Sequence, residues 1–185
     1  MNGPFVFPVR DISHRAGEMR EFDIEVPAPA KWGEGLVAVP SGEPIELQVR
    51  LESVHEGILA TVEAETRYVG VCGRCLTDIA RPVEVEFVEL FGYSETEAID
   101  FEVQDDHVDL ETPVRDSIVL SLPFQPVCQP DCLGLDPTTG EKLTEESAQE
   151  SPIDPRWTAL AAMAASTTDQ DDEAARPDAD NTEKS

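Results

Sequence analysis

The four cysteines of the chain form two close pairs. Cys72 and Cys75 stand in the motif CGRC, and Cys128 and Cys132 stand in CQPDC. Two thiols separated by two residues can face one metal ion, and a second pair brought alongside completes a tetrahedral four-sulfur site, the usual closed structural site for zinc. We expect Gly73 to let the backbone curl between the first two sulfurs. The spacing therefore predicts a structural Zn²⁺ held by Cys72, Cys75, Cys128 and Cys132.

Two other interpretations of the four thiols remain open. They could be unrelated buried or surface thiols, because CxxxC and the long gap between the pairs differ from a compact zinc finger. They could also act as a thiol-based redox switch. A thioredoxin-like dithiol lies between a strand and a helix, whereas Cys75 is followed by residues 76–82 and then by strand-like alternation. This argues against the redox interpretation.

The charge of the chain restricts its partners. The 185 residues carry 39 acidic and 13 basic side chains, which gives a formal net charge of −26. Such a charge repels phosphate backbones at long range and attracts basic proteins. We therefore expect a basic protein partner, and direct RNA binding at most at a local spot.

Neither an export signal nor a membrane span is expected. The N-terminal residues 1–8 lack a basic region, and prolines interrupt their apolar run. No stretch approaches the roughly 18 apolar residues that a membrane helix needs. Four cysteines without an export signal indicate a reducing cytosol, where thiolates bind metal more often than they form disulfides. The sequence thus predicts a cytoplasmic protein with no membrane partner.

Alternating hydrophobicity predicts a mainly antiparallel β structure. Residues 45–52 and 58–65 each alternate apolar and polar side chains, and Glu56-Gly57 supplies a turn between them. This predicts a long hairpin whose second strand leads to Cys72, and a third strand at residues 83–87 leaves the CxxC turn. Cys72 and Cys75 should therefore lie at the tip between two strands. Residues 5–7 should form an extended arm, and further short strands are expected at residues 20–26 and 36–39.

Two short helices complete the expected fold. The first should span residues 113–122, capped by Thr112, after an acidic loop that follows Tyr93. The second should begin at Asp154 and place Trp157 on its apolar side, packed against the sheet or, less favoured, contacting a partner. The predicted class is α+β: a mainly antiparallel sheet or partly open barrel with two short helices and a four-cysteine zinc knuckle. We expect one domain over residues 1–165 and a disordered acidic tail over residues 166–185.

Other chemistry-bearing residues have simpler interpretations. Arg74, near Arg67 and Arg81, could touch phosphate, but four thiolates on one zinc leave a net charge of minus two that an exposed arginine would balance. His107 lies among acids and is more simply a solvated loop histidine than a metal ligand. No carboxylate pair or nucleophile motif is recognisable, so the sequence predicts neither an enzyme nor a small-molecule substrate.

Four stretches of the chain, in this order, resemble one family. That family is the bacterial YceD family of large ribosomal RNA subunit accumulation proteins, and the resemblance covers residues 5–164. The stretches are RAGEMR at 15–20, CGRCL at 72–76, RDS at 115–117 running into LSLPFQPVC at 120–128, and IDPRWTAL at 153–160.

The chain departs from the family pattern after Cys132. Many relatives continue with Gly-Leu-Cys-x-x-Cys-Gly, whereas Asp136 and Thr139 stand here at the two cysteine positions. Four cysteines remain, and Asp136 is conceivable as a substitute oxygen ligand.

The resemblance implies a non-enzymatic role in the synthesis, processing or accumulation of large-subunit ribosomal RNA (23S). An acidic protein of this kind would bind a basic ribosomal protein or an assembly factor. The alternatives are an acidic zinc-binding adaptor or chaperone for another basic protein, and the thiol-based switch.

Overall fold

The computed structural model describes residues 3–93 and 100–145. The chain divides into two compact units, Met1–Lys142 and Leu143–Ser185, and all the strands and the helix named below belong to the first. The helix predicted from Asp154, the position of Trp157 and the tail at residues 166–185 lie outside the described residues. The domain boundary at residue 165 therefore stays a prediction.

A long hairpin forms the centre of the fold. Strand β4 (Pro44–Ser53) pairs antiparallel with β5 (Gly57–Val71), with Val49 opposite Val62. Along β4 the residues alternate strictly between exposed and buried up to Leu51. This confirms the hairpin predicted from period-two hydrophobicity, because a strand with one buried face places every second side chain in the core.

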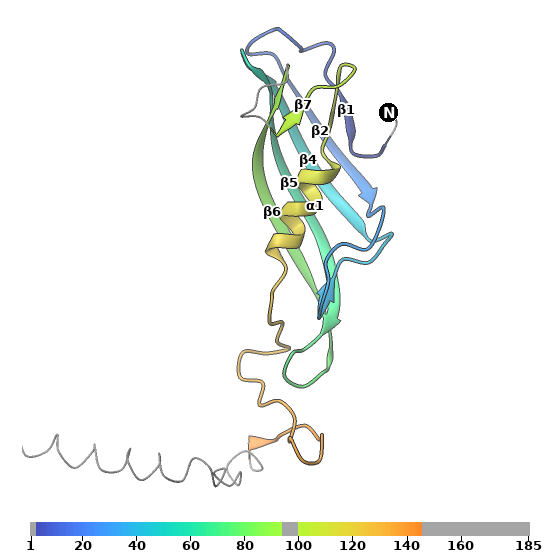
Figure 1. Cartoon of the computed structure of the whole chain (residues 1–185), viewed down its shortest axis with the longest axis vertical. Helices are drawn as coiled ribbons and strands as arrows, with labels where there is room; N and C mark the ends of the chain where they lie inside the picture. Colours follow the sequence, from blue (N-terminus) through green and yellow to red (C-terminus); the bar gives the residue numbers. More distant parts are fainter. Residues whose placement is uncertain (1–2, 94–99, 146–185) are drawn as a thin grey trace, which may run out of the picture. The chain divides into compact units, whose positions relative to one another are not determined.

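The hairpin belongs to an open, mainly antiparallel sheet (Figure 1). Its strand order is β2-β4-β5-β6-β7, and β3 also pairs with β5. The added strands are β2 (Met19–Pro27), β3 (Val37–Ala38), β6 (Asp78–Gly92) and β7 (Phe101–Glu102). Among the strands of the described residues, only β6 and β7 pair in parallel. Since no pairing within the described residues joins β2 to β7, the sheet is not closed into a barrel.

The acidic stretch after Tyr93 contains structure that the sequence did not reveal. Strand β8 (His107–Asp109) pairs antiparallel with β1 (Val6–Pro8), and Asp105 and Asp106 form the preceding turn with positive φ values of 50° and 63°. The prediction of a continuous loop was therefore wrong for this part. Strands of two or three residues are too short to show a period in sequence.

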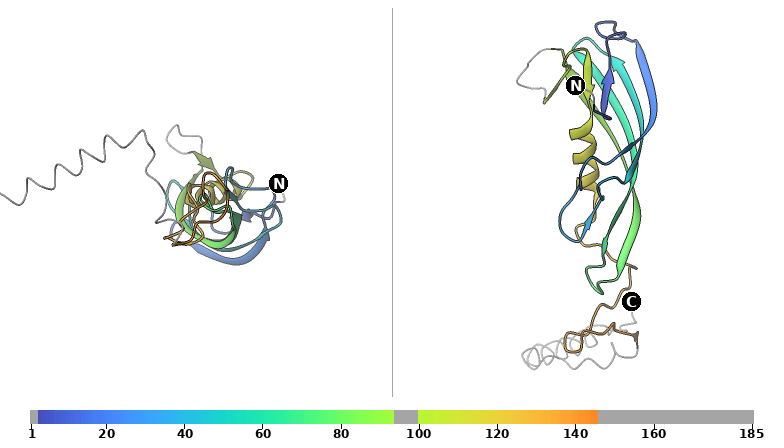
Figure 2. Two further views of the ribbon diagram at one scale, coloured as in Figure 1. Left: turned by 90° about the horizontal axis from the view of Figure 1, so that it is seen from below. Right: turned by 90° about the vertical axis from the view of Figure 1, so that its right-hand side faces the viewer.

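Helix α1 (Glu111–Ser121) covers one face of the sheet (Figure 2). The predicted helix exists, but Thr112 lies inside its first turn and is not its cap. The N-cap residue is Leu110, without a side-chain cap bond, and Asp109 Oδ1 accepts the backbone N–H of Glu111 at 3.0 Å. Val114 and Ile118 are fully buried against the sheet.

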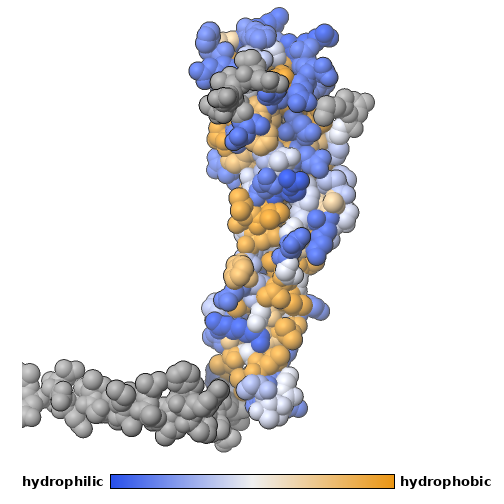
Figure 3. All heavy atoms as spheres, viewed as in Figure 1, coloured by the Kyte–Doolittle hydropathy of each residue, from blue (hydrophilic) through white to orange (hydrophobic). Residues whose placement is uncertain are grey.

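The core lies between the sheet and the elements that cover its inner face. It is mainly aliphatic, with a few buried aromatic side chains such as Phe5 and Trp32, whose ring centroids are 5.8 Å apart. On the side that carries α1, hydrophobic residues gather along the lower half, and the upper end is mostly hydrophilic (Figure 3). Among the described residues, no helix is both long and apolar enough to cross a membrane.

Candidate metal centre

The first cysteine pair lies in the tight turn between β5 and β6. The N–H of Cys72 donates to the carbonyl of Thr77 at 2.8 Å, and the N–H of Leu76 donates to the carbonyl of Cys72 at 3.0 Å. The residue in the left-handed region is Leu76, with a φ of 56°, and not Gly73. The tip position predicted for this pair is confirmed, but the role assigned to Gly73 was wrong.

Gly73 instead binds the segment that precedes the second pair. Its N–H donates to the carbonyl of Pro126 at 2.8 Å, and a Cβ at this position would lie 3.5 Å from that oxygen and 3.3 Å from Leu36 Cδ1. The chain leaves α1 through Pro123 and Pro126, which cannot continue a helix. Cys128 is thereby brought to the hairpin tip.

Two arginines of the hairpin bind the backbone of the second pair. Arg81 Nη2 donates to the carbonyl of Cys128 at 2.6 Å, and Arg74 Nη1 donates to the carbonyls of Cys132 at 2.9 Å and Pro130 at 3.5 Å. Because a guanidinium is always charged and presents several donors, it holds carbonyls firmly. These contacts fix the segment 128–132 against the turn 72–77.

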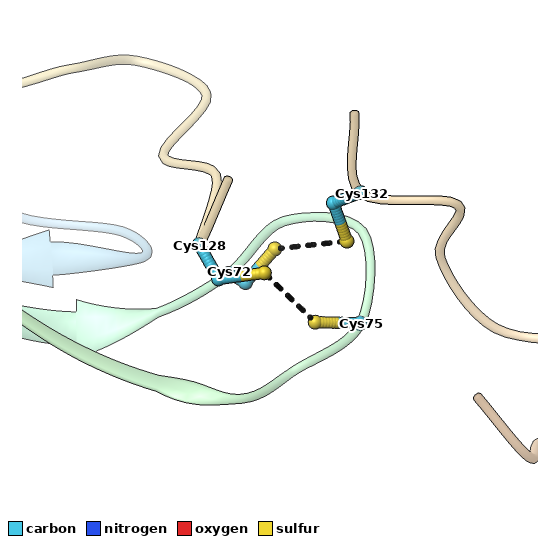
Figure 4. A group of neighbouring side chains, drawn as sticks. All are labelled: Cys72, Cys75, Cys128 and Cys132. Atoms are coloured by element: carbon cyan, nitrogen blue, oxygen red, sulfur yellow. Dashed lines mark hydrogen bonds between the residues drawn. The ribbon is translucent and has the colours of Figure 1, made fainter. Parts of the chain in front are cut away.

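The structure brings all four sulfurs together (Figure 4). The Sγ atoms all lie within 4.8 Å of one another, with Cys72 to Cys132 at 3.9 Å and Cys75 to Cys128 at 3.6 Å. Four sulfurs at about 2.3 Å from a tetrahedral zinc ion would lie about 3.8 Å apart. The distances are far longer than a disulfide bond of about 2 Å, and all four cysteines are free. The donor set therefore fits a thiolate metal centre.

The protein around the sulfurs favours thiolates at the hairpin turn. Burial raises the pKa of Cys72, but N–H groups of Cys75, Arg74 and Cys128 outweigh it and lower that pKa to about 6. The Thr77 hydroxyl, 3.0 Å from Cys75 Sγ, and then the Thr77 N–H lower the pKa of Cys75. Fixed N–H and O–H donors thus prepare both sulfurs of the turn for a cation.

When no cation is present, the protein favours protonated thiols at the second pair, Cys128 and Cys132. Hydrogen bonding with Cys75 and Cys132, followed by burial, raises the pKa of Cys128 to about 12, and burial raises the pKa of Cys132. Negative charge that collects on the first pair therefore keeps protons on the second. A divalent cation among the sulfurs reverses this balance, because a metal-bound thiol is deprotonated.

Two residues considered as further ligands do not join the sulfurs. Asp136 Oδ1 accepts the N–H groups of Thr138 at 2.7 Å and Thr139 at 2.9 Å, which lowers the pKa of Asp136 and closes a turn. His107 Nδ1 lies 2.7 Å from the carbonyl of Asp105, beside the turn before β8. Within the described residues, the four cysteines form the one cluster of three or more metal-ligand side chains.

The three arginines near the turn are each engaged with a partner. Arg67 pairs with Glu43 at 3.0 Å, whereas Arg74 and Arg81 bind carbonyls of the second cysteine pair. Neither this positioning role nor the contribution of the Thr77 hydroxyl was predicted from sequence. The role of Thr77 could have been found from its position, because a hydroxyl two residues after Cys75 can reach that sulfur. The contacts of the arginines could not, because they join segments that only the fold brings together.

Comparison with known proteins places the chain beside one family. The family model described as "Large ribosomal RNA subunit accumulation protein YceD" matches residues 60–164. An uncharacterized protein of Mycobacterium tuberculosis is 38% identical over 169 residues, which cover 86% of this chain and 81% of that protein. An uncharacterized protein of Mycobacterium leprae is 34% identical over 171 residues, 88% of this chain and 78% of the relative.

A more distant relative matches a shorter part. The uncharacterized protein YlbN of Bacillus subtilis is 31% identical over 96 residues, which are 48% of this chain and 56% of that protein. No solved structure matches the chain significantly.

Proposed function

The chain belongs to the YceD family, and we propose that it is a non-enzymatic factor in the accumulation of large-subunit ribosomal RNA. In this proposal it acts in the cytoplasm, where it binds a basic ribosomal protein or an assembly factor. The observation that carries the proposal is the family match over residues 60–164, which includes both cysteine pairs.

The metal centre has a structural role in this proposal. Cys72, Cys75, Cys128 and Cys132 would hold Zn²⁺, which would supply a cross-link between the hairpin tip and the segment after α1. Four protein sulfurs leave no open coordination position for a substrate. Three of the sulfurs are buried and Cys128 is half-buried, which suits a closed site.

The charge supports protein contacts over RNA contacts. A net charge of −26 disfavours a phosphate backbone and favours a basic partner. Around the sulfurs, Arg74 and Arg81 are engaged with backbone carbonyls, which reduces their capacity to bind phosphate.

Deletion of the gene tests the proposal. We expect the ratio of the larger to the smaller of the two main ribosomal RNAs to fall, and to be restored by the wild-type gene but not by the Cys75→Ser variant. In sedimentation, the tagged protein should travel partly with large-subunit precursors. An unchanged RNA ratio together with no precursor association would instead favour an adaptor for a basic protein unconnected with ribosomes.

A further inference from the structure

An apolar groove lies beside the metal centre. Its volume is about 310 Å³, and the residues that line it include Lys31, Leu36, Ala38, Pro40, Val69 and Gly70. Leu36 and Val69 are 40% and 37% exposed, although both are large and apolar. Leu36 also packs close to Gly73 of the metal-binding turn. The groove is therefore unfilled apolar surface.

Acidic side chains line up on the face of the sheet to which Val69 belongs. Along β5, Val69 alternates with buried neighbours in the same phase as Glu65 and Glu63, so these side chains share the outer face, opposite α1 (Figure 2). Strand register gives two rows across four strands, which we call the acidic rows: Glu25-Glu46-Glu65-Glu84 and Asp23-Gln48-Glu63-Glu86.

In the acidic rows, carboxylates of neighbouring strands lie directly opposite one another. Neighbouring strands are about 5 Å apart, and like charges opposite one another destabilise a sheet. All seven carboxylates of the rows are exposed, and none takes part in a salt bridge found among the described residues. Such an arrangement lowers the stability of the isolated protein, and cations from a partner would relieve it.

The groove and the acidic rows are close enough to act on one ligand. Val69 follows Glu65, in the nearer row, by four residues along β5, which corresponds to about 14 Å. Arg67 lies between them, but its charge is paired with Glu43. A single extended or helical segment can therefore reach both features.

We propose that the groove and the acidic rows together form the docking surface for a basic protein segment. An apolar side chain of that segment enters the groove, and its Lys and Arg side chains face Glu65, Glu84 and their neighbours. The partner's residue at the groove is not basic, because Lys31 lines it. This inference rests on the proposed function, since it assigns the protein contact a place on the fold.

The negative charge of the surface argues against two other ligands, a second copy of the chain and a nucleic acid. A second copy would place acidic rows against an equally acidic protein, which is repulsive at a net charge of −26 per chain. A nucleic acid would set phosphates against the same carboxylates. Charge complementarity thus selects a basic protein.

Site-specific photocrosslinking in growing cells tests the surface. The photoreactive residue benzoylphenylalanine replaces Val69 in the full-length chain, and in a control it replaces Leu120, which is 85% exposed on α1, on the other side of the sheet. We expect a covalent adduct with a basic protein from position 69 and none with that protein from position 120. If the Val69 variant does not fold, position 36 serves instead, since Leu36 is also exposed.

Charge reversal tests the acidic rows independently. Glu65→Lys with Glu84→Lys should lower the adduct yield by about tenfold, whereas Glu18→Lys with Glu56→Lys should leave it within about twofold. All four side chains are exposed, and the total charge change is the same. An adduct that is insensitive to the first pair overturns the proposal. The proposal is also overturned if the adduct forms with a second copy, with RNA, with an acidic protein or with residues 143–185 of the chain itself. The absence of any adduct overturns it as well.

The two proposals can fail separately. A deletion that lowers the ribosomal RNA ratio, combined with no basic adduct, retains the proposed function and removes this surface. A charge-sensitive basic adduct, combined with an unchanged RNA ratio, retains the surface and removes the ribosomal role.

Discussion

Arg74 Nη1 donates to the carbonyl oxygen of Cys132 at 2.9 Å, although 58 positions separate the two residues. Through this bond an arginine within the first cysteine pair holds the backbone of the second. The two halves of the sulfur cluster are therefore positioned by each other as well as by any bound cation. Groups that orient metal ligands in this way influence metal affinity without touching the metal.

Replacement of Arg74 should weaken metal binding while the fold is retained. Arg74→Ala removes the donor to Cys132 and should lower zinc affinity by about 10–100-fold, measured by competition with a chromophoric chelator. Arg115→Ala is the control. Among the ion pairs found in the described residues, Arg115 takes part only in the one with its neighbour Asp116. Equal zinc affinities for the two variants would remove the positioning role.

Loss of one sulfur should lower stability together with metal content. In Cys75→Ser we expect native mass spectrometry to show no bound zinc, and the melting temperature to fall by about 6 °C or more, which is about 2–3 kcal/mol for a chain of this size. The reason is that the hairpin tip and the segment after α1 would no longer share a cation.

A chelator provides the control for Cys75→Ser. It should lower the melting temperature of the wild-type protein to that of the variant and leave the variant unchanged. Thiol titration should find four reactive thiols in the wild-type protein only after chelation, since zinc thiolates are protected. A compact, metal-free wild-type protein with unchanged melting would count against the metal centre and would favour the thiol switch.

The parts of the fold that could be predicted from sequence are the strands in which apolar and polar residues alternate over many positions. The hairpin of β4 and β5 buries Leu47, Val49 and Leu51 on one face, so its strands and register follow from the pattern. Strands β1 and β8 pair over only three residues, and their pairing depends on Val6 meeting Asp109 across the fold. Local sequence carries no signal for such a contact.

The four sulfurs could be grouped from sequence, but their surroundings could not. Residue type and spacing identify Cys72 and Cys75 as a pair. The left-handed backbone conformation in the turn falls on Leu76 and not on Gly73, and the N–H of Gly73 binds the carbonyl of Pro126 in the segment before Cys128. That contact forms only once distant segments meet.

The metal-free protein should become more stable as the pH rises from about 7.5 to 9. The fold lowers the pKa of Cys72 from about 9 to about 6, so the unfolded chain binds more protons than the folded one in this window, and stability rises with pH. The lowered pKa of Cys75 has the same sign. Above pH 9 the raised pKa of Cys128, about 12, acts in the opposite direction and stability should fall.

Melting curves in excess chelator at several pH values measure this dependence. The Cys72→Ser variant is the control, and its melting temperature should rise less between pH 7.5 and 9. A wild-type melting temperature that falls across this interval would mean that the donors around the turn do not stabilise thiolates.

Replacement by alanine should lower stability by different amounts at two glycines close to Leu36. A Cβ at Gly70 would overlap the carbonyl oxygen of Leu36 and the backbone of Val37, so Gly70→Ala must separate β3 from β5. A Cβ at Gly73 would meet only the flexible end of Leu36 at 3.3 Å and the Pro126 oxygen at 3.5 Å. We expect Gly70→Ala to cost about 2–3 kcal/mol and Gly73→Ala less than about 1 kcal/mol, measured by urea unfolding of the zinc-loaded protein. Equal losses, or a larger loss at Gly73, would show that the turn and not the close approach of β3 limits stability at this end of the sheet.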